Sequence, residues 1–201
     1  MTEKLNNSRQ HRKDKKRELS PFVQTRWYRA PEVILLEKQY NESMDIWSVG
    51  IILSELMRST DKYKEETKPG RYMFKGQSCY PISPPGEIQE NKVSSNDQFI
   101  KILERYPELN KDMDMSFTTS EDQIIYVDSC LAKISSKNSI NNKFKKSSPE
   151  LVKLLKSMLE INPHFRPSAK QLLKSSIFES VRNENDKKNA TCPYRLKIKI
   201  D

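Results

Sequence analysis

The chain has 201 residues, enough for one domain with a core and flanking tails, and only 35% of them are hydrophobic. Its mean hydropathy of −0.83 indicates many solvated loops. No apolar run approaches the length of a membrane span. Three widely spaced cysteines without a CxxC pair predict free thiols and argue against a disulfide framework or a metal site. We therefore expect a soluble cytoplasmic or nuclear protein that does not bind membranes.

The net charge of +9 is unevenly distributed. Residues 9–17 contain six cations, and further lysines and arginines occur in the tail, residues 181–201. Such clusters are found in nuclear-import signals, in nucleic-acid contacts and in surfaces that bind acidic or phosphorylated segments. No aromatic residue interleaves the N-terminal cluster, which argues against nucleic-acid binding. The pattern favours a solvated, disordered basic segment.

The first predicted elements follow from polarity and apolar spacing. Residues 1–19 lack hydrophobic periodicity and predict disorder, with order beginning near Pro21. Pro31 opens a short predicted helix over about 31–38, because proline is favoured at the first helical position. The strongest helical pattern covers 44–57, where apolar or small residues lie on nearly every side. It predicts a helix that is buried all round.

The segment 59–95 is rich in Lys, Glu, Pro and Ser, and it predicts an insert or long loop. Helical spacing and capping residues then predict four more helices. These are one capped by Ser95 or Asn96 and ended by Pro107, one over about 122–133, one capped by Ser148 that runs to Ile161, and a short one from a Ser168–Gln171 capping box to about Ser176.

The last residues, 194–200, alternate between apolar and charged side chains and predict one short exposed strand. All other predicted elements are helical. The sequence therefore predicts a mainly α fold, with four or five helices around a buried central one.

Two motifs connect this pattern to a known family. TRWYRAPE occupies 25–32, and DIWSVG begins at Asp45. Together they resemble the end of the activation segment and the central helix of a eukaryotic Ser/Thr protein kinase, in the mitogen-activated and cyclin-dependent branch. The resemblance implies a partial kinase domain over 20–180, corresponding to the C-terminal lobe. The basic segment 1–19 becomes a remnant of the activation segment, and the N-terminal lobe with its β-sheet is expected to be missing.

A third motif, NPHFRPSAKQLL from Asn162, resembles the last part of the same lobe. In the family, the glutamate of APE pairs with the arginine of this motif. The resemblance therefore assigns a structural ion pair to Glu32 and Arg166, and a bidentate pair of this kind fixes geometry in two directions.

Asp45 and Trp47 are also assigned structural roles. A carboxylate within an apolar helix is costly unless it is hydrogen-bonded. The family aspartate that Asp45 matches binds backbone amides of the catalytic loop. The alternative is a simple carboxylate near a helix start, favoured by the helix dipole.

The resemblance places substrate contacts at Thr25, Arg26 and Arg29. In the family, the threonine lies beneath the target hydroxyl, and the second arginine marks kinases that prefer proline directly after the target Ser or Thr. Ser20 matches a regulatory phosphorylation site, whereas Phe22 replaces the tyrosine of the usual Thr-x-Tyr pair. Phe22 has no hydroxyl, so the dual phosphorylation switch cannot operate here.

Phosphoryl transfer needs a glycine-rich loop, a phosphate-binding lysine, a catalytic aspartate and Asp or Asn ligands for magnesium. The sequence contains none of these motifs; His11 to Asp14 only imitates a catalytic loop, because no asparagine follows and Thr25 comes too soon. We therefore expect no catalytic residue and no cofactor in this chain, although Mg-ATP serves the intact family.

Three interpretations remain open. The chain is part of an active proline-directed kinase, a non-catalytic module that docks protein substrates or pathway partners, or, less favoured, a basic nucleic-acid-binding protein. For the second, residues 71–85 with 96–99 resemble the insert through which this kinase branch binds partners.

Overall fold

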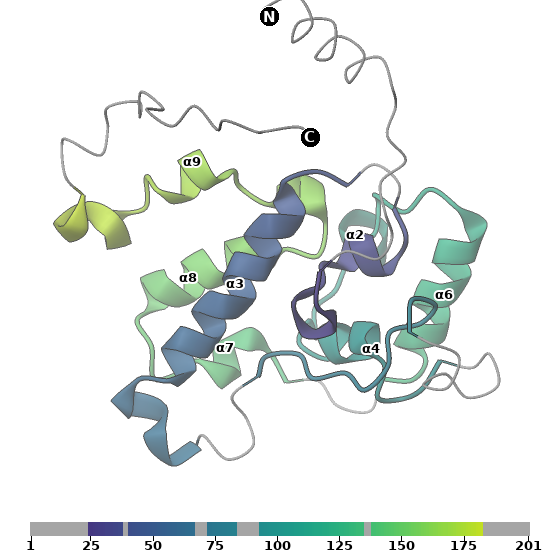
Figure 1. The fold of residues 1–201 in the computed structure, drawn as a ribbon, viewed down its shortest axis with the longest axis horizontal. Helices are drawn as coiled ribbons and strands as arrows, with labels where there is room; N and C mark the ends of the chain where they lie inside the picture. Colours follow the sequence, from purple (N-terminus) through teal and green to yellow (C-terminus); the bar gives the residue numbers. More distant parts are fainter. Residues whose placement is uncertain (1–23, 38–39, 67–71, 84–92, 135–137, 183–201) are drawn as a thin grey trace, which may run out of the picture.

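A computed structural model describes residues 24–37, 40–66, 72–83, 93–134 and 138–182 (Figure 1). Within these ranges the regular elements are all helices, and the only β interaction is an isolated bridge between Ser78 and Asp97. This confirms the mainly α prediction. No helix in these ranges is long and apolar enough to cross a membrane. The predictions for residues 1–19, Ser20, Phe22 and the tail strand lie outside the described residues.

Helix α3 (Ser43–Arg58) is the longest described helix and packs against α8 (Pro149–Met158), as Figure 1 shows. Gly50 permits this close approach, because a Cβ at that position would lie 2.8 Å from Cδ2 of Leu159. Ser148 caps α8 by accepting a hydrogen bond from the Leu151 amide.

The prediction that this helix is buried all round is wrong. One face of α3 packs into the core through Trp47 and Ile51. On the other face Val49, Ile52 and Leu56 are 50%, 48% and 62% exposed. A helix whose sequence is apolar all round needs neighbours on every side. Among the described residues, α3 has them on one side only.

Helix α2 (Pro31–Ile34) follows the 3-10 turn η1 (Arg26–Tyr28), and all four of its residues are buried. It is shorter than predicted. The chain turns at Leu35, and Leu36 takes a positive φ of 57°, which ends the helix.

Helix α4 (Gln98–Leu103) is capped by Asp97, whereas the sequence analysis predicted Ser95 or Asn96. Asp97 is fully buried and accepts hydrogen bonds from the amides of Phe99 and Tyr80 and from the Tyr126 hydroxyl. Burial raises the pKa of this carboxyl, and the hydrogen bonds counteract part of the rise.

The remaining helices are short, and most begin at a side-chain cap. Capping boxes start α6 at Ser120 and α9 at Ser168, the latter as predicted. The other bounds are η2 (Asp61–Glu66), α5 (Lys111–Asp114), α6 (Glu121–Leu131), α7 (Ile140–Lys143), η4 (Pro163–Phe165), α9 (Ala169–Leu172) and η5 (Ser176–Val181).

Part of the predicted loop 59–95 belongs to the core. Tyr63, Phe74 and Cys79 have essentially no exposed surface, and the Phe74 ring stacks on Trp47 at 5.6 Å. Cys79 and Cys130 are free buried thiols, and burial raises their pKa to about 11 and about 12. The loop prediction failed here because a few apolar residues among many polar ones carry the packing.

Candidate functional site

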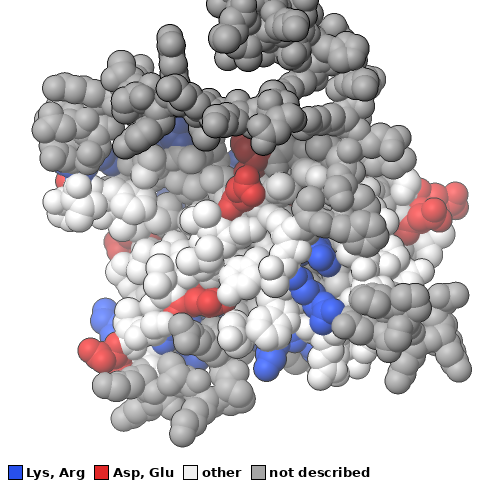
Figure 2. Space-filling view, viewed as in Figure 1, with Lys and Arg blue, Asp and Glu red and all other residues white. Residues whose placement is uncertain are grey.

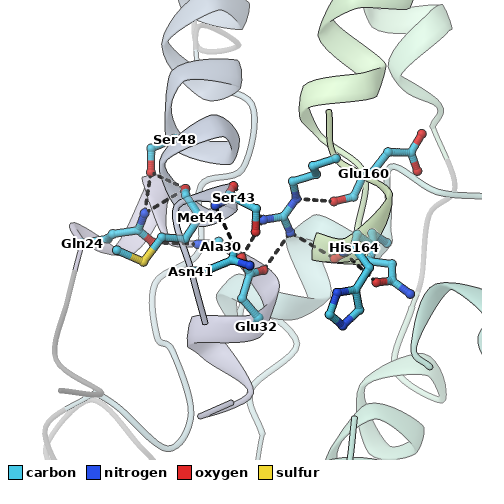
Figure 3. A network of polar contacts seen from close by, with 12 residues as sticks. Gln24, Ala30, Glu32, Asn41, Ser43, Met44, Ser48, Glu160 and His164 are labelled. Atoms are coloured by element: carbon cyan, nitrogen blue, oxygen red, sulfur yellow. Dashed lines mark hydrogen bonds and ion pairs between the residues drawn. The ribbon is translucent and has the colours of Figure 1, made fainter. Parts of the chain in front are cut away.

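Segment 24–32 lies against the first turns of α3 and is fixed at both ends (Figure 3). At its C-terminal end, Glu32 and Arg166 form a bidentate ion pair with N–O distances of 2.6 and 2.7 Å. Both side chains are 0% exposed, and the two residues are 134 positions apart. We call this pair the charged anchor.

The Arg166 guanidinium also donates to three backbone carbonyls, those of Glu160 at 2.7 Å, Ser43 at 3.1 Å and Ile161 at 3.1 Å. It lies over the Trp47 ring, 5.1 Å from the ring centre. One side chain thus joins α2, the start of α3 and the chain that follows α8. A fully hydrogen-bonded guanidinium with a bidentate carboxylate is the arrangement in which a buried charge is tolerated.

At the N-terminal end of the segment, Gln24 makes a second set of contacts. Its side-chain amide donates to the Met44 carbonyl at 3.0 Å and to the Ser48 hydroxyl at 2.7 Å, and its side-chain oxygen accepts from the Ala30 amide at 3.0 Å. The Ser48 hydroxyl also lies 3.0 Å from the Tyr28 carbonyl, to which it can donate. Figure 3 shows the part of this network that joins Gln24 to Ala30, Met44 and Ser48. We call the network the Gln24 anchor.

The sequence analysis missed the Gln24 anchor. Neither residue type signals a contact between positions 24 and 48, because glutamine and serine are ordinary surface residues. Only the positive φ of Gln24, 63°, marks the site, and φ is not visible in a sequence.

The structure places the three predicted substrate-contact residues as follows. Thr25 is exposed. Arg29 points back along the segment and donates from Nη2 to the Gln24 carbonyl at 3.0 Å. Arg26 donates from Nη1 to the Gln77 carbonyl at 2.6 Å. Both arginines are therefore held by backbone carbonyls in defined directions.

Further aromatic and basic side chains surround Trp27, which follows Arg26 in the sequence. Trp27 donates to the Gly76 carbonyl at 2.9 Å and packs against the Tyr72 ring at 4.6 Å. The Lys75 ammonium lies 5.5 Å from the centre of the Trp27 indole ring. Figure 2 shows a group of Lys and Arg side chains on this face, over the region where Figure 1 places η1.

Asp45 and Trp47 lie in different environments. Trp47 is fully buried in the core. Asp45 is exposed in the first turn of α3, where a carboxylate is favoured by the helix dipole. It is not the buried carboxylate that the apolar pattern indicated, and its family role stays a prediction. Among the described residues, no group of three or more His, Cys, Asp or Glu side chains could hold a metal ion.

A separate groove of about 770 Å³ lies beside the end of α2 and the face of α6. Leu36 and Ile125 contribute exposed apolar surface to it, 39% and 56% respectively. Tyr80, Pro81 and Val93 also line the groove, so residues of the predicted insert form one of its walls.

Comparison with known proteins agrees with this architecture. A family model described as protein kinase domain matches residues 5–178, which is most of the chain. The chain therefore belongs to the protein kinase family. The curated proteins to which it is similar include members of the mitogen-activated branch of that family.

Among these relatives are mitogen-activated protein kinase 13 from Bos taurus, 30% identical over 88% of this chain, and from Homo sapiens, 29% identical over 88%. The pmk-1 kinase of Caenorhabditis elegans is 27% identical over 84%. This chain spans 40%, 40% and 37% of the three relatives.

A solved map kinase from Leishmania major has a similar fold. Its TM-score is 0.56 at 24% identity, with 82% of this chain and 44% of that chain covered. This similarity supports the fold.

Proposed function

We propose that this chain supplies the substrate-binding side of a mitogen-activated-type Ser/Thr protein kinase that phosphorylates Ser or Thr directly before proline. The observation that supports the proposal is the hydrogen bond from Arg29 to the Gln24 carbonyl. Segment 24–32 is the part of the chain that carries the family's substrate-side motif. Thr25, exposed beside this carbonyl, is the residue that we assign to the target hydroxyl.

The physical argument concerns the residue after the target Ser or Thr. A peptide lying along segment 24–32 presents the backbone N–H of that residue to the protein. Because the Gln24 carbonyl already accepts from Arg29, it is a poor acceptor for this N–H. An amide that loses water without gaining a partner costs roughly 1–3 kcal/mol. Proline has no N–H and avoids that cost.

Phosphoryl transfer itself needs phosphate- and magnesium-binding groups whose motifs this sequence does not contain. We therefore assign Mg-ATP binding and catalysis to residues outside this chain, and peptide selection to the chain itself. The relatives are more than twice as long as the region that this chain matches. We therefore place catalysis in the part of the kinase that this chain does not match.

Fluorescence anisotropy with labelled peptides tests the proposal. Three peptides differ only after the target serine, which is followed by proline, alanine or N-methylalanine. We expect proline to bind about tenfold more tightly than alanine, and N-methylalanine to recover most of the difference because it also lacks the N–H. Equal affinities for proline and alanine would contradict the proposal, and so would Mg-ATP binding by the isolated chain in calorimetry.

A second candidate function is partner docking without catalysis, and the groove beside α2 and α6 favours it. This groove combines exposed apolar side chains with the wall formed by the predicted insert. Such a surface suits an extended peptide with an apolar side chain. Ile125→Asp is expected to abolish capture of pathway proteins while leaving the Ser-Pro peptide affinity unchanged. If the variant still captures them, docking through this groove is excluded.

We also propose a cytoplasmic or nuclear location, on the grounds that Cys79 and Cys130 are free thiols. Cell fractionation followed by immunoblotting tests it, and recovery from a secretory compartment would contradict it.

A further inference from the structure

A further groove, of about 540 Å³, lies where α7 and α8 meet, and it shares no lining residue with segment 24–32 or with the groove beside α2 and α6. Three exposed lysines line it, Lys145 in the loop after α7 and Lys153 and Lys156 on α8. Figure 1 shows α7 and α8 on one side of the fold and α6 on the other. We call this groove the lysine groove.

The lysine groove has an excess of positive charge. Of the described residues that line it, Glu160 alone carries a carboxylate. Burial and Asp114 raise the pKa of Glu160, and Lys156 counteracts part of the rise, so Lys156 is partly balanced. Lys153 lies three positions before Lys156 on the same face of α8, where like charges repel. A concave surface with charges of one sign concentrates ligands of the opposite sign, so the groove suits an anionic occupant.

Apolar surface lies beside these lysines. Pro149 is exposed, Val152 is half-buried, and both line the groove. Phe144 also lines it, but its side chain is 0% exposed and offers no ring face on which a nucleic-acid base could stack. An occupant that matches both parts has an apolar side chain flanked by carboxylates. A peptide provides this combination, whereas a nucleic acid does not.

Tyr63 holds one wall of the groove in place. Its hydroxyl accepts a hydrogen bond from the Lys146 amide at 3.0 Å and lies 3.0 Å from the Ser147 hydroxyl. Its ring packs edge-on against Phe144, with the ring centres 6.2 Å apart. Lys145 therefore lies between two residues that Tyr63 contacts, and its backbone is positioned before a ligand binds. A site formed in advance loses less entropy on binding.

We propose that the lysine groove binds an acidic peptide segment of a partner protein. An apolar side chain of the segment contacts Pro149 and Val152, and its carboxylates lie beside the lysines of the groove. This docking is separate from the selection of Ser-Pro peptides at segment 24–32, so either activity can be present without the other. The electrostatic part of the affinity falls with added salt, whereas the apolar part does not.

Fluorescence anisotropy with the 201-residue chain tests the proposal. The probe is a labelled peptide with a central leucine flanked on both sides by aspartates, and its control has asparagines in their place. At low salt we expect the aspartate peptide to bind at least about tenfold more tightly than the asparagine peptide. Replacing its leucine by serine should weaken binding about fivefold. Equal affinities in either comparison would contradict the proposal.

Charge reversal locates the binding within the chain. The double variant Lys153→Glu, Lys156→Glu is expected to bind the aspartate peptide at least about tenfold more weakly and to bind a matching lysine peptide instead. The double variant Lys170→Glu, Lys174→Glu makes the same change in net charge at exposed lysines outside the groove, and it is the matched control. Equal weakening in the two double variants would mean that the total charge of the chain attracts the peptide, which would overturn the proposal.

Competition separates this groove from the other candidate sites. Unlabelled Ser-Pro peptide is expected to leave the aspartate peptide bound, and displacement would assign the acidic peptide to segment 24–32. We expect single-stranded oligothymidylate to bind more weakly than the aspartate peptide. If it binds more tightly and loses affinity in Lys153→Glu, Lys156→Glu, the groove belongs to nucleic acid and the peptide assignment is wrong.

Carbodiimide coupling identifies the lysines that lie next to the bound peptide, because the reagent joins a carboxylate to an adjacent amine. Mass spectrometry is expected to find the aspartate peptide attached to Lys145, Lys153 or Lys156. Attachment only to lysines elsewhere in the chain would place the peptide outside the groove and overturn the proposal.

Discussion

Both anchors hold segment 24–32 in place, the charged anchor through an ion pair and the Gln24 anchor through neutral hydrogen bonds. The charged anchor, Glu32 with Arg166, has no exposed side-chain surface and joins residues 134 positions apart. The Gln24 anchor is neutral and half-buried, and it joins residues 20 and 24 positions apart. One fixes the segment to the core of the fold, and the other holds the residues to which we assign substrate binding.

The difference in charge and burial determines how much free energy is lost when either anchor is broken. A buried charge that loses its partner cannot be rehydrated without unfolding its surroundings, so the charged anchor is either complete or very costly. A half-buried amide can exchange its protein partners for water at a small cost. We therefore expect changes at the charged anchor to affect stability, and changes at the Gln24 anchor to affect selectivity.

The largest expected effect comes from breaking the charged anchor. Glu32→Gln keeps the shape of the side chain but leaves the Arg166 charge buried without a carboxylate, and it should lower the free energy of unfolding by roughly 3–5 kcal/mol in urea titrations. Asp128→Asn, which breaks the exposed pair with Lys111, is the control and should cost less than about 1 kcal/mol. Similar losses in the two variants would remove the basis of the comparison.

The second-largest expected effect on stability concerns Trp47, whose ring lies against the Arg166 guanidinium of the charged anchor. Trp47 stacks on Phe74 and lies under the Arg166 guanidinium, so Trp47→Leu should cost roughly 2–4 kcal/mol of unfolding free energy. Its indole nitrogen is buried and finds no hydrogen-bond partner among the described residues. Trp47→Phe, which removes that group and keeps a ring, should therefore cost clearly less. Equal costs for the two variants would show that the ring contacts add little.

Much of the fold could be predicted from the sequence because its signals are local. Ser148 and Ser168 each cap a helix where the sequence predicts one, since capping depends on residues three positions away. The cap of α4 was misassigned because Asp97 stands next to two other capping residues and only burial distinguishes them. The exposed face of α3 could not be predicted, because an apolar pattern does not reveal which neighbours are present.

The candidate site likewise has one part that the sequence predicts and one part that it does not. A family motif at each end of the matched region directed attention to Glu32 and Arg166, and the structure brings the two together. Nothing in the sequence connects Gln24 with Ser48, because the contact depends on a positive φ and on the path of the turn. Tertiary contacts between ordinary polar residues have no periodicity that a sequence could display.

The Gln24 anchor should contribute a smaller share of stability. Gln24→Ala removes three neutral hydrogen bonds from a half-buried site and places alanine at a positive φ, so we expect a loss of about 1–2 kcal/mol in the same urea titrations. Ser48→Ala should cost about half as much. A loss as large as that of Glu32→Gln would mean that both anchors serve the fold, and it would weaken the separation between stability and selectivity.

The smallest effect concerns Lys143, a lysine whose ammonium group binds a backbone carbonyl. Lys143 donates to the Tyr72 carbonyl at 3.1 Å, and burial, together with Arg105 and Arg58, lowers its pKa from 10.5 to about 8. Above pH 8 the folded chain loses this proton, while the unfolded chain keeps it up to about 10.5. The unfolded state then binds more protons, so stability should rise with pH in that window.

Lys143→Met removes this titration, and the wild type should gain melting temperature relative to the variant between pH 8 and pH 10.5. Taking the difference cancels the opposite trend from buried thiols such as Cys79, whose raised pKa makes stability fall as the unfolded thiols ionise. Lys170→Met, at an exposed lysine, is the control and should show no such trend. A pH-independent difference would show that Lys143 ionises alike in both states. The contact with the Tyr72 carbonyl would then make no pH-dependent contribution to stability in this window.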